Sequence, residues 1–275
     1  MEGLTTADSI GVAVAGYGYW GANLARNVVA AMSTRLVVQS WRFDVDVICT
    51  RNPAGVVAAY LIPGVIGVFD TDDGPAGGLN YSLAVPFATV VTAPEAVGDA
   101  IDARRLSTYR GFKASAYLHP NRFRPNRSVL ESLDVTGQPY SIVRFVSMRA
   151  VHDVGEFGIP AQERERLVAQ LSTVMPVFVS SEDVGDTYGH PFTLDPVLFH
   201  DALGLARLYV GDSQSVAIEA CLLGTPAIHC SSWSGRLANL QGLISEGLLE
   251  SFQPGVDVDI AQRSLRPPSA LLPMK

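Results

Sequence analysis

The sequence predicts an α/β protein made of two Rossmann-like, parallel-sheet domains. Short apolar runs alternate with longer segments of helical periodicity, which is the pattern of repeated β–α–β units. Hydrophobic residues make up 48% of the 275 residues and charged residues 17%, so the chain can bury a sizeable core. Its 25 Gly and 17 Pro favour many short loops over a helical bundle.

In the first half of the chain, short apolar runs predict buried strands, and the longer segments between them predict helices. The run at 10–15 is expected to form the first strand, and 20–32 the helix that follows it. The remaining predicted elements are strands at 35–39, 45–50, 67–70 and 89–92 and helices at 53–61 and 81–87.

From residue 140 onward the alternation is more regular and predicts a compact second β–α domain. We expect a shortened first domain at 1–118, a second domain at 119–256 and a flexible tail at 257–275. The segment 116–137, which contains prolines and turn formers, is expected to be a linker. The strands expected in the second domain are 140–147, 177–180, 208–211 and 226–229, and the helices are 161–171, 196–206 and 215–223.

The charge and cysteine content exclude several classes of protein. The formal net charge is −7 and no stripe of Lys or Arg is visible, so a nucleic-acid partner is not expected. Cys49, Cys221 and Cys230 have no C-x-x-C spacing, which predicts buried, reduced thiols rather than a redox or metal site. The longest apolar run, at 56–69, is broken by Pro and Gly, and the N-terminus has no basic segment typical of a secretory signal. We therefore expect a soluble, cytoplasmic protein with no integral membrane segment.

A glycine-rich turn follows the first predicted strand. Gly16, Gly18 and Gly21 have the G-x-G-x-x-G spacing, between a strand and a helix, that lets backbone amides approach a pyrophosphate. Residues 8–32 closely resemble the start of the Gfo/Idh/MocA oxidoreductases, which implies NAD(P) binding. The chain departs from that family after the second predicted strand, where the first acidic residue is Asp44, and it has no Glu-Lys-Pro segment. The alternative is that the glycines cradle a phosphate or only form a tight turn.

A second resemblance covers residues 44–254. The matching sequence segments include Arg51-Asn52-Pro53, Phe69-Asp70-Thr71-Asp72-Asp73-Gly74, Tyr117-Leu118-His119-Pro120, Ser180-Ser181-Glu182 and Leu223-Gly224-Thr225-Pro226. The segment resembles the uncharacterised bacterial and archaeal domain-of-unknown-function family 354, which is glycosyltransferase-like and related to GT-B enzymes and UDP-N-acetylglucosamine 2-epimerases. The resemblance implies a GT-B-like fold whose first domain is incomplete, because the oxidoreductase-like opening stands where the family has its own first strand and helix.

The junction of a strand and a helix at 211–215 is a candidate ligand site. Asp212 and Ser213 end the predicted strand, and the backbone amides of the helix start and the Ser213 hydroxyl are expected to face an anion. Glu219 follows on the same helix, and the resemblance to GT-B enzymes and 2-epimerases implies that it holds a ribose. We predict that Asp212, Ser213 and Glu219 bind phosphate and ribose; the alternative is that the first two only cap the helix.

Arg144 lies inside an otherwise apolar predicted strand, where a buried guanidinium needs a partner. The candidate partners are Asp153, Glu182 and Asp212, and such a pair is either a structural ion pair or a phosphate clamp. We predict that Arg144, His152 and Glu182 are catalytic. His152 is expected to act as acid or base because a histidine titrates near neutrality, and a surface hydrogen bond is its alternative role.

Polar residues in the predicted linker are candidate substrate contacts. His119, Asn121 and Arg122 are expected to contact a sugar or phosphate, as is Asp153, although a hinge-stabilising role is equally open. The acidic turn at 70–73 is either a Mg²⁺ site for a diphosphate or, as we favour, a loop of solvated acids. No metal site is therefore predicted.

Three functions follow from these observations. The first is a glycosyltransferase-like protein that binds a nucleotide-sugar in an inter-domain cleft, with the nucleotide-sugar as a small-molecule substrate and no certain cofactor. The second is a degenerate, non-catalytic nucleotide-binding protein, and the third is an NAD(P)-dependent oxidoreductase that uses the Gly16–Gly21 turn. The sequence has no H-E-x-x-H, Walker lysine loop or G-x-S-x-G motif, which disfavours those enzyme classes.

Overall fold

The computed structural model describes residues 12–14, 46–148, 155–183 and 185–255. The chain divides into two compact units, Met1–Gly111 and Phe112–Lys275. The sequence predicted the division after residue 118, whereas the chain divides after Gly111, which assigns the segment 112–118 to the second unit. The glycine-rich turn, the helix expected at 20–32, the strand expected at 35–39 and the tail at 257–275 lie outside the described residues.

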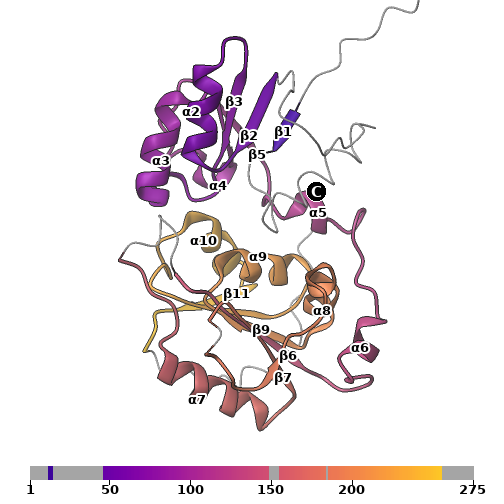
Figure 1. Ribbon diagram of the computed structural model, residues 1–275. Helices are drawn as coiled ribbons and strands as arrows, with labels where there is room; N and C mark the ends of the chain where they lie inside the picture. The colour runs from indigo at the N-terminus through magenta and orange to yellow at the C-terminus, as the bar shows by residue number, and fades with distance from the viewer. Residues whose placement is uncertain (1–11, 15–45, 149–154, 184, 256–275) are drawn as a thin grey trace, which may run out of the picture. The chain divides into compact units, whose positions relative to one another are not determined.

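The first unit contains a parallel sheet with the strand order β1-β2-β3-β4-β5 (Figure 1). Each described strand lies beside the one that precedes it in the chain, so the strand order does not reverse within this part of the sheet. The elements are β1 (Val12–Val14), β2 (Val47–Thr50), α2 (Pro53–Leu61), β3 (Ile66–Asp70), η1 (Gly74–Gly77), α3 (Gly78–Ala84), η2 (Val85–Phe87), β4 (Val90–Pro94), α4 (Glu95–Gly98) and β5 (Leu106–Tyr109).

Local sequence explains where α2 begins. The side chain of Asn52 accepts a hydrogen bond from the backbone N of Ala54 at 2.9 Å, and a proline occupies the first helical position. Val56 of this helix then packs into the core of the first unit with Phe69 of β3 and Val91 of β4, and each of the three is at most 1% exposed. The helix predicted at 53–61 is confirmed with the same bounds.

The second unit is built on a parallel sheet with the strand order β11-β10-β9-β6-β7-β8 (Figure 1). The chain moves from β6 to β7 and β8 and then returns to the other side of β6 for β9, so the strand order reverses between β6 and β9. The strands are β6 (Ser141–Phe145), β7 (Val177–Ser181), β8 (His190–Pro191), β9 (Leu208–Gly211), β10 (Ala227–Cys230) and β11 (Leu249–Phe252). The helices are α5 (Ser115–Leu118), α6 (Val129–Ser132), α7 (Ala161–Ser172), η4 (Pro196–Leu198), α8 (Phe199–Leu205), α9 (Gln214–Leu222) and α10 (Ala238–Ser245).

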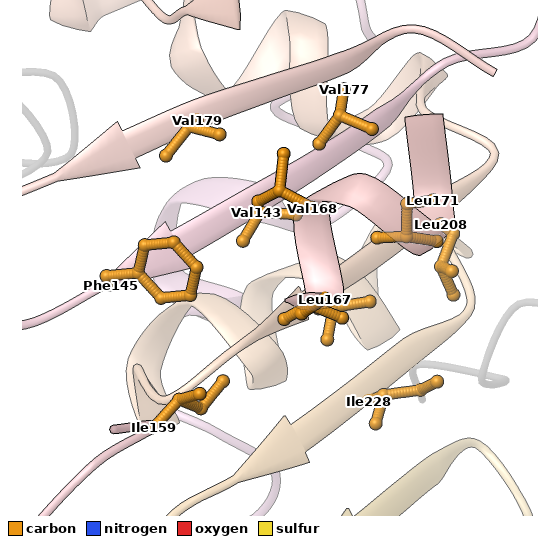
Figure 2. Close-up of a cluster of buried hydrophobic side chains, with 11 residues drawn as sticks. Val143, Phe145, Ile159, Leu167, Val168, Leu171, Val177, Val179, Leu208 and Ile228 are labelled. Carbon is orange, nitrogen blue, oxygen red and sulfur yellow. The ribbon is translucent and has the colours of Figure 1, made fainter. Parts of the chain in front are cut away.

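One face of the second sheet packs against α7. Leu167 and Leu171 lie one turn apart on this helix and contact the same cluster as Val143 and Phe145 of β6 (Figure 2). These four side chains are between 0% and 6% exposed. Because successive residues of a strand point to opposite faces, Arg144 points away from this core and toward the other face of the sheet.

The segment predicted as a linker, 116–137, is part of the second unit. It contains the end of α5 and all of α6, and Leu118, Val129 and Leu130 are at most 9% exposed, whereas most of its residues are exposed. Its prolines and glycine indicate turns, and its few buried apolar residues hold it in the second unit. The sequence also failed to predict β5, α10 and the edge strand β11, whose central residues Glu250 and Ser251 break the apolar run expected of a buried strand.

The predicted fold class, α/β with two Rossmann-like parallel-sheet bodies, is confirmed. That the first domain is incomplete stays a prediction, since residues 15–45 lie outside the described part of the chain. None of the helices described has the length and apolar character needed to cross a membrane.

Candidate functional site

The carboxyl ends of β6 and β9 mark the candidate site. In open α/β sheets, ligands bind outside the carboxyl ends of the strands, at the point where the strand order reverses. In the second unit this point lies between β6 and β9, which pair in parallel. Val146 and Ser147 follow β6 and Asp212 and Ser213 follow β9, so these residues form the edge that a ligand would meet.

Ser213 caps α9 at this edge. Its backbone is extended (φ −84°, ψ 111°), and its Oγ accepts a hydrogen bond from the backbone N of Val216 at 3.4 Å. The first-turn amides of a helix have no intrahelical acceptor and carry the positive end of the helix dipole, so the start of α9 favours an anion. Gly211 allows the strand to enter this turn, because a Cβ there would meet the carbonyl of Arg144 and, at 2.6 Å, the hydroxyl of Tyr209.

Asp212 holds the loop that follows β6. One carboxylate oxygen accepts a hydrogen bond from the backbone N of Val146 at 2.8 Å, and the other accepts from Ile159 at 3.1 Å. The residue is 2% exposed, and burial raises the pKa of Asp212 to about 6, although these hydrogen bonds and Arg164 oppose that shift. Both oxygens of the carboxylate predicted to bind a ligand are therefore taken by backbone amides.

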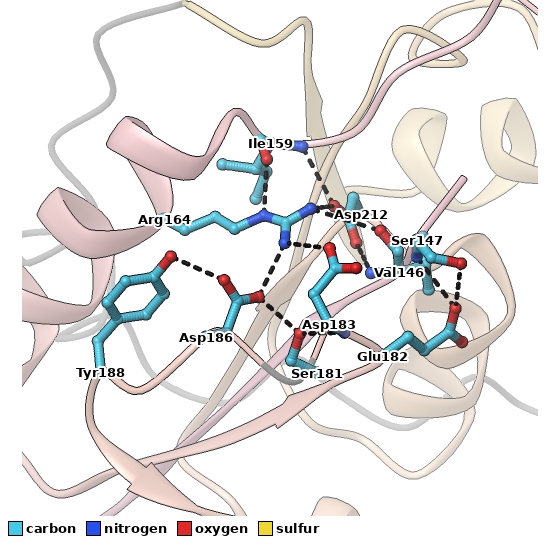
Figure 3. Close-up of polar contacts among 10 residues, drawn as sticks. All are labelled: Val146, Ser147, Ile159, Arg164, Ser181, Glu182, Asp183, Asp186, Tyr188 and Asp212. Atoms are coloured by element: carbon cyan, nitrogen blue, oxygen red, sulfur yellow. Dashed lines mark hydrogen bonds and ion pairs between the residues drawn. The ribbon is translucent and has the colours of Figure 1, made fainter. Parts of the chain in front are cut away.

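Arg164 of α7 lies at the centre of a buried charged cluster (Figure 3). Its Nη1 donates to Asp183 at 3.1 Å and to Asp186 at 2.8 Å, its Nε donates to the carbonyl of Ile159 at 2.8 Å, and Asp212 lies 4.0 Å from Nη2. The side chain of Arg164 is only 11% exposed. We call Arg164, Asp183, Asp186 and Asp212 the Arg164 cluster. Its contacts connect α7 with the loops that follow β6, β7 and β9, next to the candidate site.

Arg144 pairs with Glu182, so one of its three predicted partners is confirmed. Nη2 of Arg144 donates to Glu182 at 2.7 Å, and Nη1 donates to the Oγ of Ser180 at 2.7 Å. The other carboxylate oxygen of Glu182 accepts from the backbone N and the hydroxyl of Ser147, both at 3.0 Å. Burial raises the pKa of Glu182, but the bonds from Ser147 and the charge of Arg144 outweigh it and bring the pKa below its usual value. A carboxylate of lowered pKa is a weak base, so this pair is better suited to holding charge than to moving a proton.

Glu219 is buried on α9. It is 1% exposed, and its Oε1 accepts a hydrogen bond from the hydroxyl of Tyr117 at 2.7 Å. Its Oε2 lies 3.2 Å from Nε2 of His200, an ion-pair distance, but it makes no hydrogen bond. The carboxylate predicted to hold a ribose is thus on the helix that begins at Ser213, but protein side chains cover it.

The predicted substrate contacts of the linker form a turn of their own. Nδ1 of His119 accepts a hydrogen bond from the backbone N of Asn121 at 3.2 Å, and the carbonyl oxygen of His119 accepts one from the backbone N of Arg122 at 2.7 Å. Asn121 and Arg122 are exposed. The remaining predicted site residues, His152, Asp153, Gly16, Gly18 and Gly21, lie outside the described residues.

The acidic turn of the first unit is paired with an arginine. Arg51 contacts Asp72 and lies 3.5 Å from Asp73, and the hydroxyl of Thr92 donates to Asp70 at 2.9 Å. These acids are therefore neither simply solvated, as expected, nor free to hold a cation. Within the described ranges, no group of three or more His, Cys, Asp or Glu is arranged to bind a metal ion.

Sequence reasoning missed Arg164, Tyr117 and His200 as site residues. A signal for Arg164 was present, because it shares helical spacing with Leu167 and Leu171 and so puts a charge in the apolar stripe of α7. For Tyr117 and His200 no comparable signal exists, since each meets Glu219 only through the fold.

Comparisons with known proteins bear on the fold. No family model matches the chain, and no curated protein matches it. The family assigned from residues 44–254 therefore stays a prediction.

Three solved structures with a similar fold are the following. The UDP-GlcNAc 2-epimerase of Methanocaldococcus jannaschii in complex with UDP-GlcNAc and UDP has a TM-score of 0.55 and 11% identity, covering 88% of this chain and 72% of that one. A Listeria monocytogenes protein, provisionally assigned as a UDP-N-acetylglucosamine 2-epimerase, has a TM-score of 0.55 and 14% identity, with 88% and 67% covered. MnaA of S. aureus with UDP has a TM-score of 0.52 and 11% identity, with 88% and 68% covered.

At these identities the likeness shows the fold alone. The chain spans about two thirds of the length of the structures it matches. Its fold class, two Rossmann-like parallel-sheet bodies, is shared with these epimerase structures, and this confirms the fold class predicted from the sequence.

Proposed function

We propose that this chain binds a nucleotide-activated sugar at the carboxyl edge of its second sheet and is a glycosyltransferase-like or nucleotide-sugar-modifying protein. The diphosphate is held at the start of α9 by Ser213 and the first-turn amides. The ribose is held by Glu219, further along the same helix. Arg144, paired with Glu182, supplies positive charge beside this edge.

One observation carries the proposal: a capped helix and a buried carboxylate that lacks a hydrogen bond on one oxygen lie on one element, at the point where the strand order reverses. The helix start favours a phosphate, and α9 begins directly after β9. Glu219 is 1% exposed, and its Oε2 makes no hydrogen bond. A buried acceptor without a hydrogen bond is costly, and the two hydroxyls of a ribose supply donors for such a carboxylate.

The chemistry proposed for this site is stabilisation of a leaving diphosphate. Preorganised donors and a fixed positive charge stabilise negative charge that develops in a transition state. The amides at the start of α9 and Arg144 are the groups of this kind on the described edge. His152, which lies outside the described residues, remains our candidate acid or base.

The fold of the similar structures supports the same substrate class. The M. jannaschii epimerase was solved with UDP-GlcNAc and UDP, and MnaA with UDP. We therefore propose a uridine diphosphate sugar as the first ligand to test, and membership of the domain-of-unknown-function family 354 over residues 44–254.

NAD(P) binding through the Gly16–Gly21 turn is the second candidate function. The strand β1 that leads toward this turn is part of a parallel sheet, beside β2, as the strand before a dinucleotide-binding turn is. The turn itself lies outside the described residues, so ligand binding has to separate the two candidates.

A thermal-shift measurement tests the proposal. The purified chain is heated with UDP, UDP-N-acetylglucosamine, NAD⁺ or NADP⁺, because a ligand that binds only the native state raises the unfolding midpoint. We expect the uridine nucleotides to raise it and Glu219→Gln to abolish the rise. The matched control is Glu246→Gln, an exposed glutamate at the end of α10, which is expected to keep it. A rise with NAD⁺ alone, lost in Gly18→Val, would instead support the oxidoreductase.

A turnover assay separates an enzyme from a degenerate binding protein. UDP-N-acetylglucosamine is incubated with the chain, and UDP release and sugar epimerisation are followed by chromatography and NMR. Product that disappears in Arg144→Met supports catalysis. A thermal shift without any product supports the non-catalytic alternative.

A further inference from the structure

Glu219 is held by side chains from two distant parts of the second unit. Tyr117, on the one-turn helix α5, donates its hydroxyl to Oε1 at 2.7 Å. His200, on α8, places Nε2 3.2 Å from Oε2. The rings of Tyr117 and His200 also lie against each other, with centroids 5.5 Å apart. A ribose therefore meets a carboxylate whose surroundings are already filled.

A ligand reaches this carboxylate only if one of its neighbours moves. Glu219 is 1% exposed, which leaves no room for a sugar hydroxyl beside it. The bond from Tyr117 is an O–H donor on a carboxylate oxygen, which is the same kind of bond that a ribose hydroxyl makes. A ribose diol brings two such donors, one to replace the tyrosine hydroxyl and one for Oε2, which has no hydrogen bond. The exchange replaces the hydrogen bond from Tyr117 by one from the ribose and adds a hydrogen bond at Oε2, beside Nε2 of His200, which lies 3.2 Å from that oxygen.

Tyr117 is held less firmly than His200. In α8, five successive residues from Phe199 to Leu203 are buried, so His200 is part of a packed helix. In α5, only Leu118 is buried, and Tyr117 itself is partly exposed. Because fewer of its residues are buried, we expect displacement of α5 to cost less free energy than displacement of α8.

We propose that the Tyr117 hydroxyl occupies the place of a ribose hydroxyl on Glu219 and that nucleotide binding displaces it, releasing the segment 112–118. This inference rests on the proposed function of Glu219. Phe112 is the first residue of the second unit, so the segment that is released is the one by which the chain enters that unit. Occupancy of α9 is thereby transmitted to the connection between the two units.

The first test compares UDP affinity by isothermal titration. Removing a competing hydroxyl makes Tyr117→Phe bind UDP about tenfold more tightly than the wild type, a difference of about 1.4 kcal/mol. The matched control is Tyr188→Phe, which also removes a tyrosine hydroxyl bonded to a carboxylate at 2.7 Å, that of Asp186, and leaves the Kd for UDP unchanged. An unchanged or weaker affinity in Tyr117→Phe overturns the proposal, because the hydroxyl then does not compete with the ligand.

The second test needs no variant and uses hydrogen exchange of the wild-type chain. The backbone amides of Tyr117 and Leu118 both donate to the carbonyl of Ala114, so they exchange slowly while α5 is formed. We expect saturating UDP to speed exchange in 112–118 while it slows exchange at the start of α9. Protection at α9 without faster exchange in 112–118 overturns the displacement but leaves the proposed function standing. No UDP binding by the wild type overturns both.

Discussion

Replacing Arg164 by methionine removes the only positive charge of the Arg164 cluster and keeps much of its apolar stem. The guanidinium lies 2.8 Å from Asp186, 3.1 Å from Asp183 and 4.0 Å from Asp212, and its carbon lies 4.9 Å from the centre of the Phe145 ring. The side chains of Asp186 and Asp212 are 6% and 0% exposed. In the Arg164→Met variant, these carboxylates stay buried without their cation.

The expected loss of unfolding free energy is about 3–5 kcal/mol, the cost of breaking a buried ion pair by removing one partner. The matched control is Arg236→Met. Arg236 has as good a geometry, with Nη1 at 2.7 and 2.9 Å from the two carboxylate oxygens of Glu156, but its side chain is 55% exposed. Each of the two arginines also lies over an aromatic ring, Arg164 over Phe145 at 4.9 Å and Arg236 over Trp233 at 4.8 Å. An exposed ion pair contributes about 0–1 kcal/mol, so the difference between the two variants reports mainly the effect of burial.

Urea unfolding followed by far-UV circular dichroism measures this difference. Tryptophan fluorescence does not serve here, because the guanidinium carbon of Arg236 lies 4.8 Å from the centre of the Trp233 ring and the control substitution would change the signal of that tryptophan. The midpoints of the two arginine variants are compared at equal denaturant slope. If Arg164→Met loses no more stability than Arg236→Met, burial does not govern the energetics of this cluster.

Three further predictions concern the second unit. Burial lowers the pKa of His229 from 6.5 to about 4, so the unfolded chain binds a proton more readily than the folded one, and the protein loses stability as the pH falls from 6.5 to about 4. In His229→Asn, the free energy of unfolding should fall by about 3 kcal/mol less over that pH range than in the wild type. An equal fall in both proteins would refute this. Leu171→Ala empties a fully buried position and should cost about 2–5 kcal/mol in urea, whereas a smaller loss would mean that the core refills the space. Gly158→Ala puts a Cβ against the carboxylate of Asp212 and should cost about 1–3 kcal/mol, with faster hydrogen exchange at Ile159; a neutral substitution would contradict the close packing of this loop.

Much of the fold was predictable because it depends on short-range signals. The helix at 53–61 was predicted with correct bounds because a capping asparagine and a proline mark its start. The strand at 208–211 was likewise predicted with correct bounds, and the helix that begins at Gln214 was predicted one residue late. The segment 116–137 was predicted as a linker from its turn residues, which are local signals; that Leu118, Val129 and Leu130 are buried in the second unit depends on contacts with residues distant in the chain.

The sequence by itself determined that this is an α/β chain with repeated β–α units, and it placed Ser213 at the start of a helix after a buried strand. These are consequences of apolar periodicity and helix capping, which act between residues close together in the chain. The sequence also left Arg144 with three possible partners, and only the pairing of β6 with β7 selected Glu182.

Only the tertiary structure decided what surrounds the candidate ligand groups. The carboxylate of Asp212 accepts hydrogen bonds from two backbone amides. The carboxylate of Glu219 is covered by Tyr117 and His200, which are far from it in the chain. No local pattern encodes such contacts, because they depend on which faces of the helices pack together and on how the strands are ordered. Burying a charged carboxylate without hydrogen-bond donors costs much free energy. The partners of Asp212 and Glu219 are therefore the donors that the tertiary structure places beside them.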